Sequence, residues 1–255
     1  TTAYQFNNTE HAANLFGLKE FGNIYSRLGN PTVGALEARL TALEGGAMSV
    51  ALASGTSAVM YSLINIMSQG DNFISASQLY GGTYTMFDNI LPEYGINAKK
   101  VDITDLIAVE DSIDEKTRAV YCETVTNPGL VVADVTALSE IAHKHGIPLI
   151  VDATFTTSAI QKSFDFGADI VVYSLTKWMS GHGRVIAGAV IEKGGFDWGN
   201  GNFPLYDKPD TSYGNMRWGH DLGDLGNVAY SLRLRTVPLR NLGANMSPDT
   251  AFEVM

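Results

Sequence analysis

The sequence is poor in features that mark several large classes of protein. Its single cysteine, Cys122, excludes an intrachain disulfide and fits a reducing compartment. No apolar run approaches the ~18 residues that a membrane span needs. No basic segment followed by an apolar one opens the chain, as a signal peptide would. We therefore expect a cytoplasmic protein with no membrane partner.

Basic residues are also scarce. Lys and Arg number 17 against 27 Asp and Glu, which gives a formal net charge of −10. This balance gives no electrostatic support for binding nucleic acid or an anionic membrane. The nucleotide-phosphate motifs GxGxxG and GxxxxGK followed by Ser or Thr do not occur, and the 5 histidines show no metal-ligand spacing. We predict neither a nucleic-acid partner nor a metal.

The composition that remains is that of a well-buried globular protein. Of the 255 residues, 45% are hydrophobic and 17% are charged. A chain of this length buries roughly 70–75% of the surface that its unfolded form exposes, so it needs no disulfide or metal to hold it together. The sequence begins on Thr1 rather than Met and stops at Met255 without a closing element. We expect it to be a piece of a longer protein.

Helix-period and strand-like segments alternate along the chain. Apolar spacing predicts helices over 33–43 and 56–68, and Asp134 is a suitable N-cap for a third helix that stops at Gly146. Continuous apolar runs predict strands at 72–76, 119–122, 148–152 and 169–173. This alternation predicts an α/β fold with a mainly parallel sheet between helices. Residues 194–224, rich in glycine, predict a long irregular segment, and 232–235 read as a basic helix.

Ligands of such sheets bind beyond the carboxyl ends of the strands. Glu123, Asp152 and Ser174 each follow a predicted strand directly. The strand before Asp152 is wholly apolar, so its carboxylate would be costly to bury unless it met a cation, and a protonated pyridine nitrogen would serve. The alternative for Asp152 is a helix N-cap on the following segment.

The segment Ser174–Lys177 combines two hydroxyls and an amine at the end of an apolar strand. Side chains two residues apart on an extended segment point the same way, so Ser174 and Thr176 could bind one phosphate. A partly desolvated Lys177 could lose its charge and act as a nucleophile. The alternative is a solvated turn with a surface lysine.

Two glycine-containing segments add further binding functions. Residues 53–57 open the buried helix, where free N–H groups bind anions and Gly55 allows close approach; an ordinary N-cap is the alternative. Residues 80–84 offer an aromatic face suited to stacking a planar ring, or else a simple tight turn. Cys122 is expected to be a core residue. A phosphate cradle, an acid, an aromatic face and an activated lysine together indicate pyridoxal phosphate held as a Schiff base.

These motifs resemble those of the pyridoxal-phosphate enzymes of cysteine and methionine metabolism, most closely the O-acetylhomoserine sulfhydrylase branch. Cystathionine γ-synthase, the cystathionine lyases and methionine γ-lyase share the motifs. The resemblance implies the fold type I of pyridoxal-phosphate-dependent transferases. The matching segments, in order, are Tyr25–Arg27 with Asn30–Thr32, Ser54–Gly55, Tyr80–Thr83, Glu123 with Asn127–Pro128, Val151–Thr154, and Ser174–Lys177 leading to Gly181–Gly183.

The resemblance implies a role for each matching residue. Lys177 corresponds to the Schiff-base lysine, Asp152 to the partner of the pyridine nitrogen and Tyr80 to the ring-stacking tyrosine. The catalytic residues so implied are these three. The remaining cofactor-binding residues are Gly55, Thr56, Ser174 and Thr176 at the phosphate, Asn127 near the 3-hydroxyl, and Tyr25 and Arg27, which in the family reach the phosphate of a neighbouring subunit. A homodimer or homotetramer with shared active sites follows from that last pair.

The resemblance also implies an activity and a division into domains. The expected reaction is γ-replacement on O-acetyl-L-homoserine with sulfide or a thiol, giving homocysteine or methionine plus acetate. The alternatives are cystathionine or methionine γ-lyase, cystathionine γ-synthase, or a truncated, catalytically silent cofactor-binding subunit. Residues 1–29 would form an arm towards the neighbouring subunit, 30–228 the large cofactor-binding domain and 229–255 the start of an incomplete C-terminal domain. Arg184 stands where the family has small polar residues.

Overall fold

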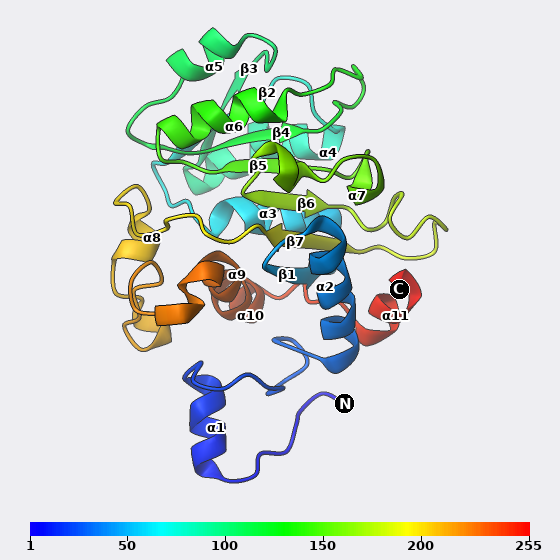
Figure 1. Ribbon diagram of the computed structural model, residues 1–255, viewed down its shortest axis with the longest axis vertical. Helices are drawn as coiled ribbons and strands as arrows, with labels where there is room; N and C mark the ends of the chain where they lie inside the picture. The colour runs from blue at the N-terminus through cyan, green and yellow to red at the C-terminus, as the bar shows by residue number, and fades with distance from the viewer.

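A single seven-stranded sheet organises the computed structural model, which describes residues 1–255 (Figure 1). The strand order is β1-β7-β6-β5-β4-β2-β3. The strands are β1 (Met48–Leu52), β2 (Asn72–Ala76), β3 (Asn97–Val101), β4 (Thr117–Glu123), β5 (Leu149–Asp152), β6 (Ile170–Tyr173) and β7 (Gly188–Glu192).

All strands but one point in the same direction. β7 is antiparallel to both of its neighbours, β1 and β6, and every other pair is parallel. The central strands β4, β5 and β6 are almost wholly buried, as their Val- and Ile-rich sequences require of strands covered on both faces. The predicted mainly parallel α/β sheet of the fold type I class is confirmed.

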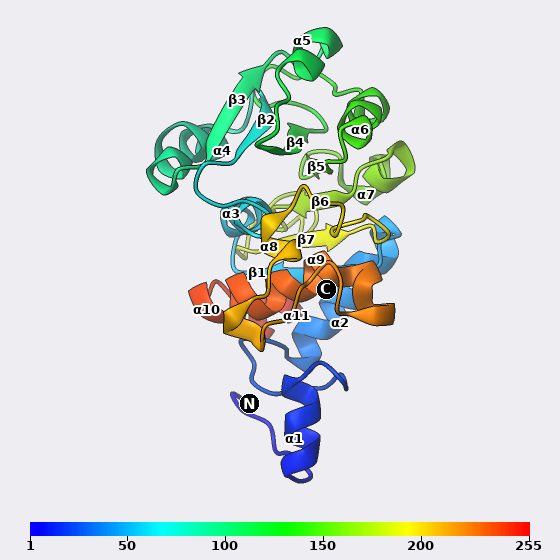
Figure 2. The same cartoon turned by 90° about the vertical axis from the view of Figure 1, so that its left-hand side faces the viewer.

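Helices cover both faces of the sheet. Figure 2 shows α3 and α4 on one side and α6 and α7 on the other, and α3 packs on β1, β6 and β7. The helices are α1 (Thr9–Phe16), α2 (Pro31–Glu44), α3 (Gly55–Ile64), α4 (Gly81–Thr85), α5 (Leu106–Asp111), α6 (Val135–Lys144), α7 (Thr157–Ile160), α8 (Pro204–Asp207), α9 (Ala229–Leu234), α10 (Arg240–Leu242) and α11 (Pro248–Val254). None of them is long and apolar enough to cross a membrane.

The predicted helices are present, with one difference in length. In α2 the Asn30 side chain accepts a hydrogen bond from Thr32 N, and Gly45 ends the helix with a φ of 79°. Asp134 caps α6 as expected. Helix α3 ends at Ile64 rather than at residue 68, and the side chain of the next residue, Asn65, donates to the Tyr206 hydroxyl and to Tyr230 O.

Residues 194–224 are better packed than the sequence predicted. They form short helical turns such as α8, and Trp198 stacks on both Tyr206 and Tyr230 with ring centroids 5.1 Å apart. Trp198, Phe203, Tyr206 and Trp218 are all buried. The glycines therefore lie in turns that connect the residues of a buried aromatic cluster, and the segment is not a loosely packed loop.

The two ends of the chain differ in how they join the core. Helix α9 packs on β1 and β7, and Tyr230 and Leu232 belong to the same hydrophobic core as the sheet. The N-terminal segment with α1 projects from the opposite end of the molecule to α5 (Figures 1 and 2). The domain division at residues 29 and 228 stays a prediction.

Candidate active site

A cavity of about 690 Å³ opens at the carboxyl ends of β4, β5 and β6, beside the start of α3. This is the edge at which parallel sheets bind ligands. Its lining brings together residues that are far apart in the sequence, and apolar side chains such as Phe155 and Trp178 form part of its wall. The predicted site residues that line it are Gly55, Thr56, Tyr80, Asn127, Asp152, Ser174, Thr176 and Lys177.

Asp152 ends β5 inside this cavity. Its carboxylate accepts a hydrogen bond from Thr154 N at 3.0 Å and one from the Tyr121 hydroxyl at 3.4 Å, and it forms no salt bridge. Burial raises the pKa of the Asp152 carboxyl, and the bonds from Thr154 and Tyr121 offset this in part. A buried carboxylate without a cation is stabilised by any positively charged ligand atom placed against it.

The start of α3 provides an anion site. Ser54 caps the helix by accepting a hydrogen bond from Ser57 N at 3.0 Å, so the N–H groups of Gly55 and Thr56 have no partner within the helix. A Cβ atom on Gly55 would lie 2.5 Å from Cβ of Ser174. The glycine therefore allows the helix terminus to approach Ser174, the residue after β6, closely.

The two hydroxyls of the Ser174–Lys177 segment differ in their bonding. The Thr176 hydroxyl donates to Ala187 O at 3.1 Å and accepts from Ala187 N at 3.0 Å. Its proton is thus used within the protein, whereas the Ser174 hydroxyl forms no hydrogen bond with the protein. The Ser174 hydroxyl can donate to a phosphate without any rearrangement. The Thr176 hydroxyl can do so only if it first gives up its hydrogen bond to Ala187 O.

Lys177 lies on the loop after β6, at the cavity. Its side chain is exposed and forms no salt bridge, so the partial desolvation expected from the sequence is absent in this chain. The reason is local: β6 ends at Tyr173 and the following residues run over the open side of the cavity. The amine is free to bond a ligand.

Glu123, at the end of β4, bonds two other segments of the cavity lining. Its carboxylate accepts from Tyr80 N at 2.7 Å and from Asn127 N at 3.0 Å. Burial, followed by the negative charge of Asp152, raises the pKa of Glu123 to about 7, and the two backbone bonds limit the rise. The sequence predicts that Glu123 follows a strand, but it predicts no role for the side chain.

Thr154 is a second residue whose function the sequence did not reveal. Its N–H bonds Asp152, and its hydroxyl accepts from Ser174 N at 2.8 Å, which joins the ends of β5 and β6. The signal that could have identified it is its position two residues after Asp152. It holds the acid and the phosphate segment together.

Tyr25 and Arg27 lie outside the cavity, on the N-terminal segment. The Arg27 guanidinium carbon is 5.0 Å from the centre of the Tyr25 ring, and its Nε atom is buried without a hydrogen-bond partner. Neither residue lines the site of its own chain. Their role at a neighbouring subunit's phosphate stays a prediction.

The cavity lining matches the chemistry of pyridoxal phosphate. The helix terminus and Ser174 suit a phosphate, the uncompensated Asp152 suits a protonated ring nitrogen, Tyr80 offers a ring to stack on, and Lys177 supplies an amine. No His, Cys, Asp and Glu cluster of three or more in the structure is arranged to hold a metal ion. The positions of the helix terminus, Asp152, Tyr80 and Lys177 around one cavity fit this organic cofactor.

Comparison with known proteins points to one family. The sequence profile of the family described as Cys/Met metabolism PLP-dependent enzyme matches residues 1–255, the whole chain. O-acetyl-L-homoserine sulfhydrylase of Leptospira meyeri is 44% identical over 260 residues. Homocysteine synthase of Schizosaccharomyces pombe is 43% identical over 255 residues.

Solved structures agree with the sequence comparison. A Campylobacter jejuni protein described as an O-acetylhomoserine (thiol)-lyase, with N'-pyridoxyl-lysine-5'-monophosphate, superposes with a TM-score of 0.95 at 39% identity. It covers 100% of this chain, which covers 62% of that protein. Cystathionine gamma-lyase of Lactobacillus plantarum gives a TM-score of 0.77 at 29% identity, with 100% of this chain and 55% of that one covered. The chain matches the Leptospira and Schizosaccharomyces relatives over 100% and 99% of its own length, and spans 59% of theirs.

Proposed function

Because the chain belongs to the Cys/Met metabolism PLP-dependent enzyme family, we propose that this protein binds pyridoxal phosphate in the cavity at the carboxyl edge of its sheet. The activity proposed is γ-replacement on O-acetyl-L-homoserine by sulfide or a thiol, which gives homocysteine or methionine plus acetate. The convergence of Asp152, Lys177 and the α3 terminus on one cavity carries the proposal. The names of the relatives support the choice of substrate.

The residues of the cavity divide the binding between them. The amides of Gly55 and Thr56 and the Ser174 hydroxyl would hold the phosphate, Tyr80 would stack on the ring, and Asn127 would lie near the 3-hydroxyl. When bound, pyridoxal phosphate supplies an electron-accepting ring that stabilises negative charge at the substrate Cα. Asp152 keeps the ring nitrogen protonated, and this charge pair offsets the cost of burying its carboxylate.

Lys177 has two successive tasks in this proposal. Lys177 would hold the cofactor through its amine. Once freed by the substrate amine, this amine would take a proton from the substrate Cα, pass it on and then take one from Cβ, and both carbons would regain a proton after sulfur has bonded. Loss of acetate from Cγ and bonding of sulfur to the same carbon complete the exchange. The open position of Lys177 on the loop after β6 leaves its amine the freedom that these proton transfers need.

We further propose that the active protein is a homodimer or homotetramer. Tyr25 and Arg27 lie on the projecting N-terminal segment and outside the cavity of their own chain, as expected if they complete the site of a second copy. We also propose a cytoplasmic location, since the single cysteine fits a reducing compartment. Sedimentation of the full chain tests the assembly, and a monomeric active species would contradict it.

The lysine assignment is tested by borohydride reduction of the protein loaded with pyridoxal phosphate, followed by peptide mapping. We expect the pyridoxyl label on Lys177 and on no other lysine. Lys177→Ala should abolish the label and the visible absorbance of bound cofactor. Lys162→Ala, at an exposed lysine outside the cavity, should leave both unchanged. A label on another residue of the wild type would refute the site.

The reaction itself is tested by supplying O-acetyl-L-homoserine with and without sulfide. Homocysteine and acetate formed only when sulfide is present would support γ-replacement. Formation of mainly 2-oxobutyrate and ammonia would show an eliminating lyase instead. A protein that retains pyridoxal phosphate yet consumes no substrate would match the silent cofactor-binding subunit.

A further inference from the structure

Glu123 lies where three segments of the cavity lining meet. It is the last residue of β4, it is 6% exposed, and in the sheet register it stands opposite Asp152 of β5. Each of its two carboxylate oxygens accepts one backbone N–H. One comes from Tyr80, which precedes α4, and the other from Asn127, in the loop after β4.

The two bonded segments also pack against each other without Glu123. A Cβ atom on Gly129 would lie 1.6 Å from Oε1 of Gln78, so the Asn127 loop and the segment before Tyr80 are in close contact there. A Cβ atom on Gly82 would lie 2.7 Å from Cε1 of Tyr80, so the glycine leaves room for the Tyr80 ring. Both contacts fix the backbone around Tyr80 and Asn127, whose side chains line the cavity.

No cation pairs with Glu123. The titratable groups next to it are Asp152, Tyr121 and Cys122, all on β4 and β5. Its charged neighbour is another acid, Asp152, so no ion pair holds the Glu123 carboxyl in place. The hydrogen bonds from two backbone N–H groups, at 2.7 Å and 3.0 Å, are the interactions that hold it.

We propose that Glu123 is a positioning residue that holds Tyr80 and Asn127 as one unit, so that the stacking ring and the amide approach a single bound cofactor in fixed register. The identity of the ligand in this inference rests on the proposed function. The joining of the Tyr80 and Asn127 segments by Glu123, called the clamp below, rests only on the two hydrogen bonds to the backbone. Glu123 touches neither reacting atoms nor substrate in this proposal, and it acts only through the two segments that it joins.

The test is Glu123→Gln in the full chain. The glutamine carbonyl can accept one N–H, but its amide group faces the other N–H donor, so one bond is lost. Loss of one buried hydrogen bond is worth about one power of ten in an opening equilibrium. We expect roughly tenfold faster hydrogen exchange in residues 77–84 and 124–131 of protein prepared without pyridoxal phosphate, and unchanged exchange in β5 and β6.

The loaded protein gives the second readout. At equal bound cofactor, the visible circular-dichroism band, which reports a fixed orientation of the ring, should be weaker in Glu123→Gln than in the wild type. Glu123→Asp keeps both oxygens on a shorter side chain and should restore part of the exchange protection and of the band. It also replaces the glutamine variant if that variant fails to fold.

Glu192→Gln is the matched control. Glu192 is likewise a buried glutamate whose carboxylate accepts one backbone N–H and one side-chain N–H. It lies beside the start of β6, at the opposite end of the strands from the cavity. It should leave exchange at 77–84 and 124–131 unchanged.

Unchanged exchange in Glu123→Gln, or exchange raised equally over the whole chain, would overturn the clamp. A wild type that takes up no pyridoxal phosphate would defeat the proposed function, while the exchange result would still decide the clamp.

Discussion

At position 55 the fold leaves no room for a side chain. In Gly55→Ala the new Cβ atom would lie 2.5 Å from Cβ and 2.8 Å from Oγ of Ser174, so the start of α3 would have to move away from β6. We expect a loss of about 1–3 kcal/mol in the free energy of unfolding, because overpacking at a tight contact costs this much. Cofactor binding should weaken as well, since the two free amides move with the helix. Urea unfolding and titration with pyridoxal phosphate measure the two effects.

Gly34→Ala is the matched control for this substitution. Gly34 lies inside α2, and a Cβ atom there would meet nothing within 4 Å. Alanine in a helix interior is favoured over glycine by about 0.5–1 kcal/mol, so this variant should be as stable as the wild type or more so. Equal losses in both variants would show that the contact with Ser174 is not the cause.

Sequence reasoning brings to the cavity those predicted site residues whose signal is local. Gly55 and Asp152 are recognisable from the elements that directly precede or follow them. The bonds of Thr176 could not be read in this way, because its partner Ala187 is brought beside it by β7. The role of Glu123 depends on the N–H of Tyr80, which is remote in sequence and close only after β2 and β4 pair.

At the scale of elements, sequence reasoning missed β1, β3 and β7, and of these only β3 lacks the apolar run of a buried strand. β3, an edge strand of sequence NAKKV, carries Lys99 and Lys100 and is only partly buried. β1 (Met48–Leu52) and β7 (Gly188–Glu192) are apolar and almost wholly buried, but each is only 5 residues long. Which residues become strands is decided here by neighbours in the sheet, and local propensity alone is a weak guide.

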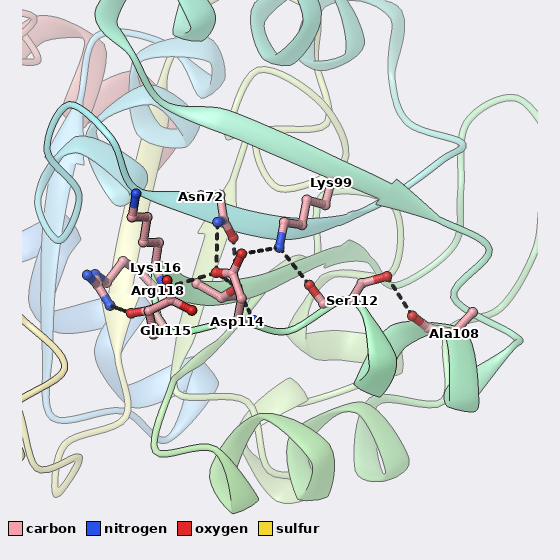
Figure 3. Close-up of polar contacts among 9 residues, drawn as sticks. Asn72, Lys99, Ala108, Ser112, Asp114, Glu115, Lys116 and Arg118 are labelled. Atoms are coloured by element: carbon pink, nitrogen blue, oxygen red, sulfur yellow. Dashed lines mark hydrogen bonds and ion pairs between the residues drawn. The ribbon is translucent and has the colours of Figure 1, made fainter.

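Asp114 joins three strands at the edge of the sheet remote from the cavity (Figure 3). Its carboxylate accepts from Lys99 Nζ of β3 at 2.6 Å and from Asn72 Nδ2 of β2 at 2.9 Å. Lys116 N and the hydroxyl of Thr117, at the start of β4, complete the set. The ion pair with Lys99, followed by the bond from Asn72, holds the pKa of Asp114 well below its usual value.

We predict that Asp114→Asn lowers the free energy of unfolding at pH 7 by about 1–2 kcal/mol, because asparagine keeps one acceptor and loses the ion pair. The carboxyl is partly exposed, so solvent screening keeps the effect in this range. A lowered folded-state pKa stabilises the fold above the unfolded value of 3.8 and loses that contribution as the pH falls below it. The difference between wild type and variant should therefore shrink in acid. Asp111→Asn, at an exposed aspartate without a hydrogen bond, should change little at either pH.

At the scale of the whole molecule, two sets of carboxyls make stability depend on pH in opposite ways. Asp114 and other paired surface carboxyls favour the fold above acid pH. Glu192 and Glu44 are buried without a salt bridge, and burial raises the pKa of each, to about 7 for Glu192. The reversed direction of β7 places Glu192 away from the cavity, so its contribution concerns folding alone.

A carboxyl with a raised pKa binds its proton more tightly in the folded chain. Glu192 therefore favours the fold below its unfolded value of 4.5, and this contribution is lost as the pH rises through about 7. The loss is on the order of 3 kcal/mol. Glutamine mimics the protonated carboxyl, so Glu192→Gln should flatten the fall in stability between about pH 5 and pH 8, as followed by urea unfolding at several pH values. Glu140→Gln removes the same charge from the exposed face of α6 and should leave the slope unchanged. Parallel curves for the wild type and Glu192→Gln would show that Glu192 is already ionised at no cost in the folded protein.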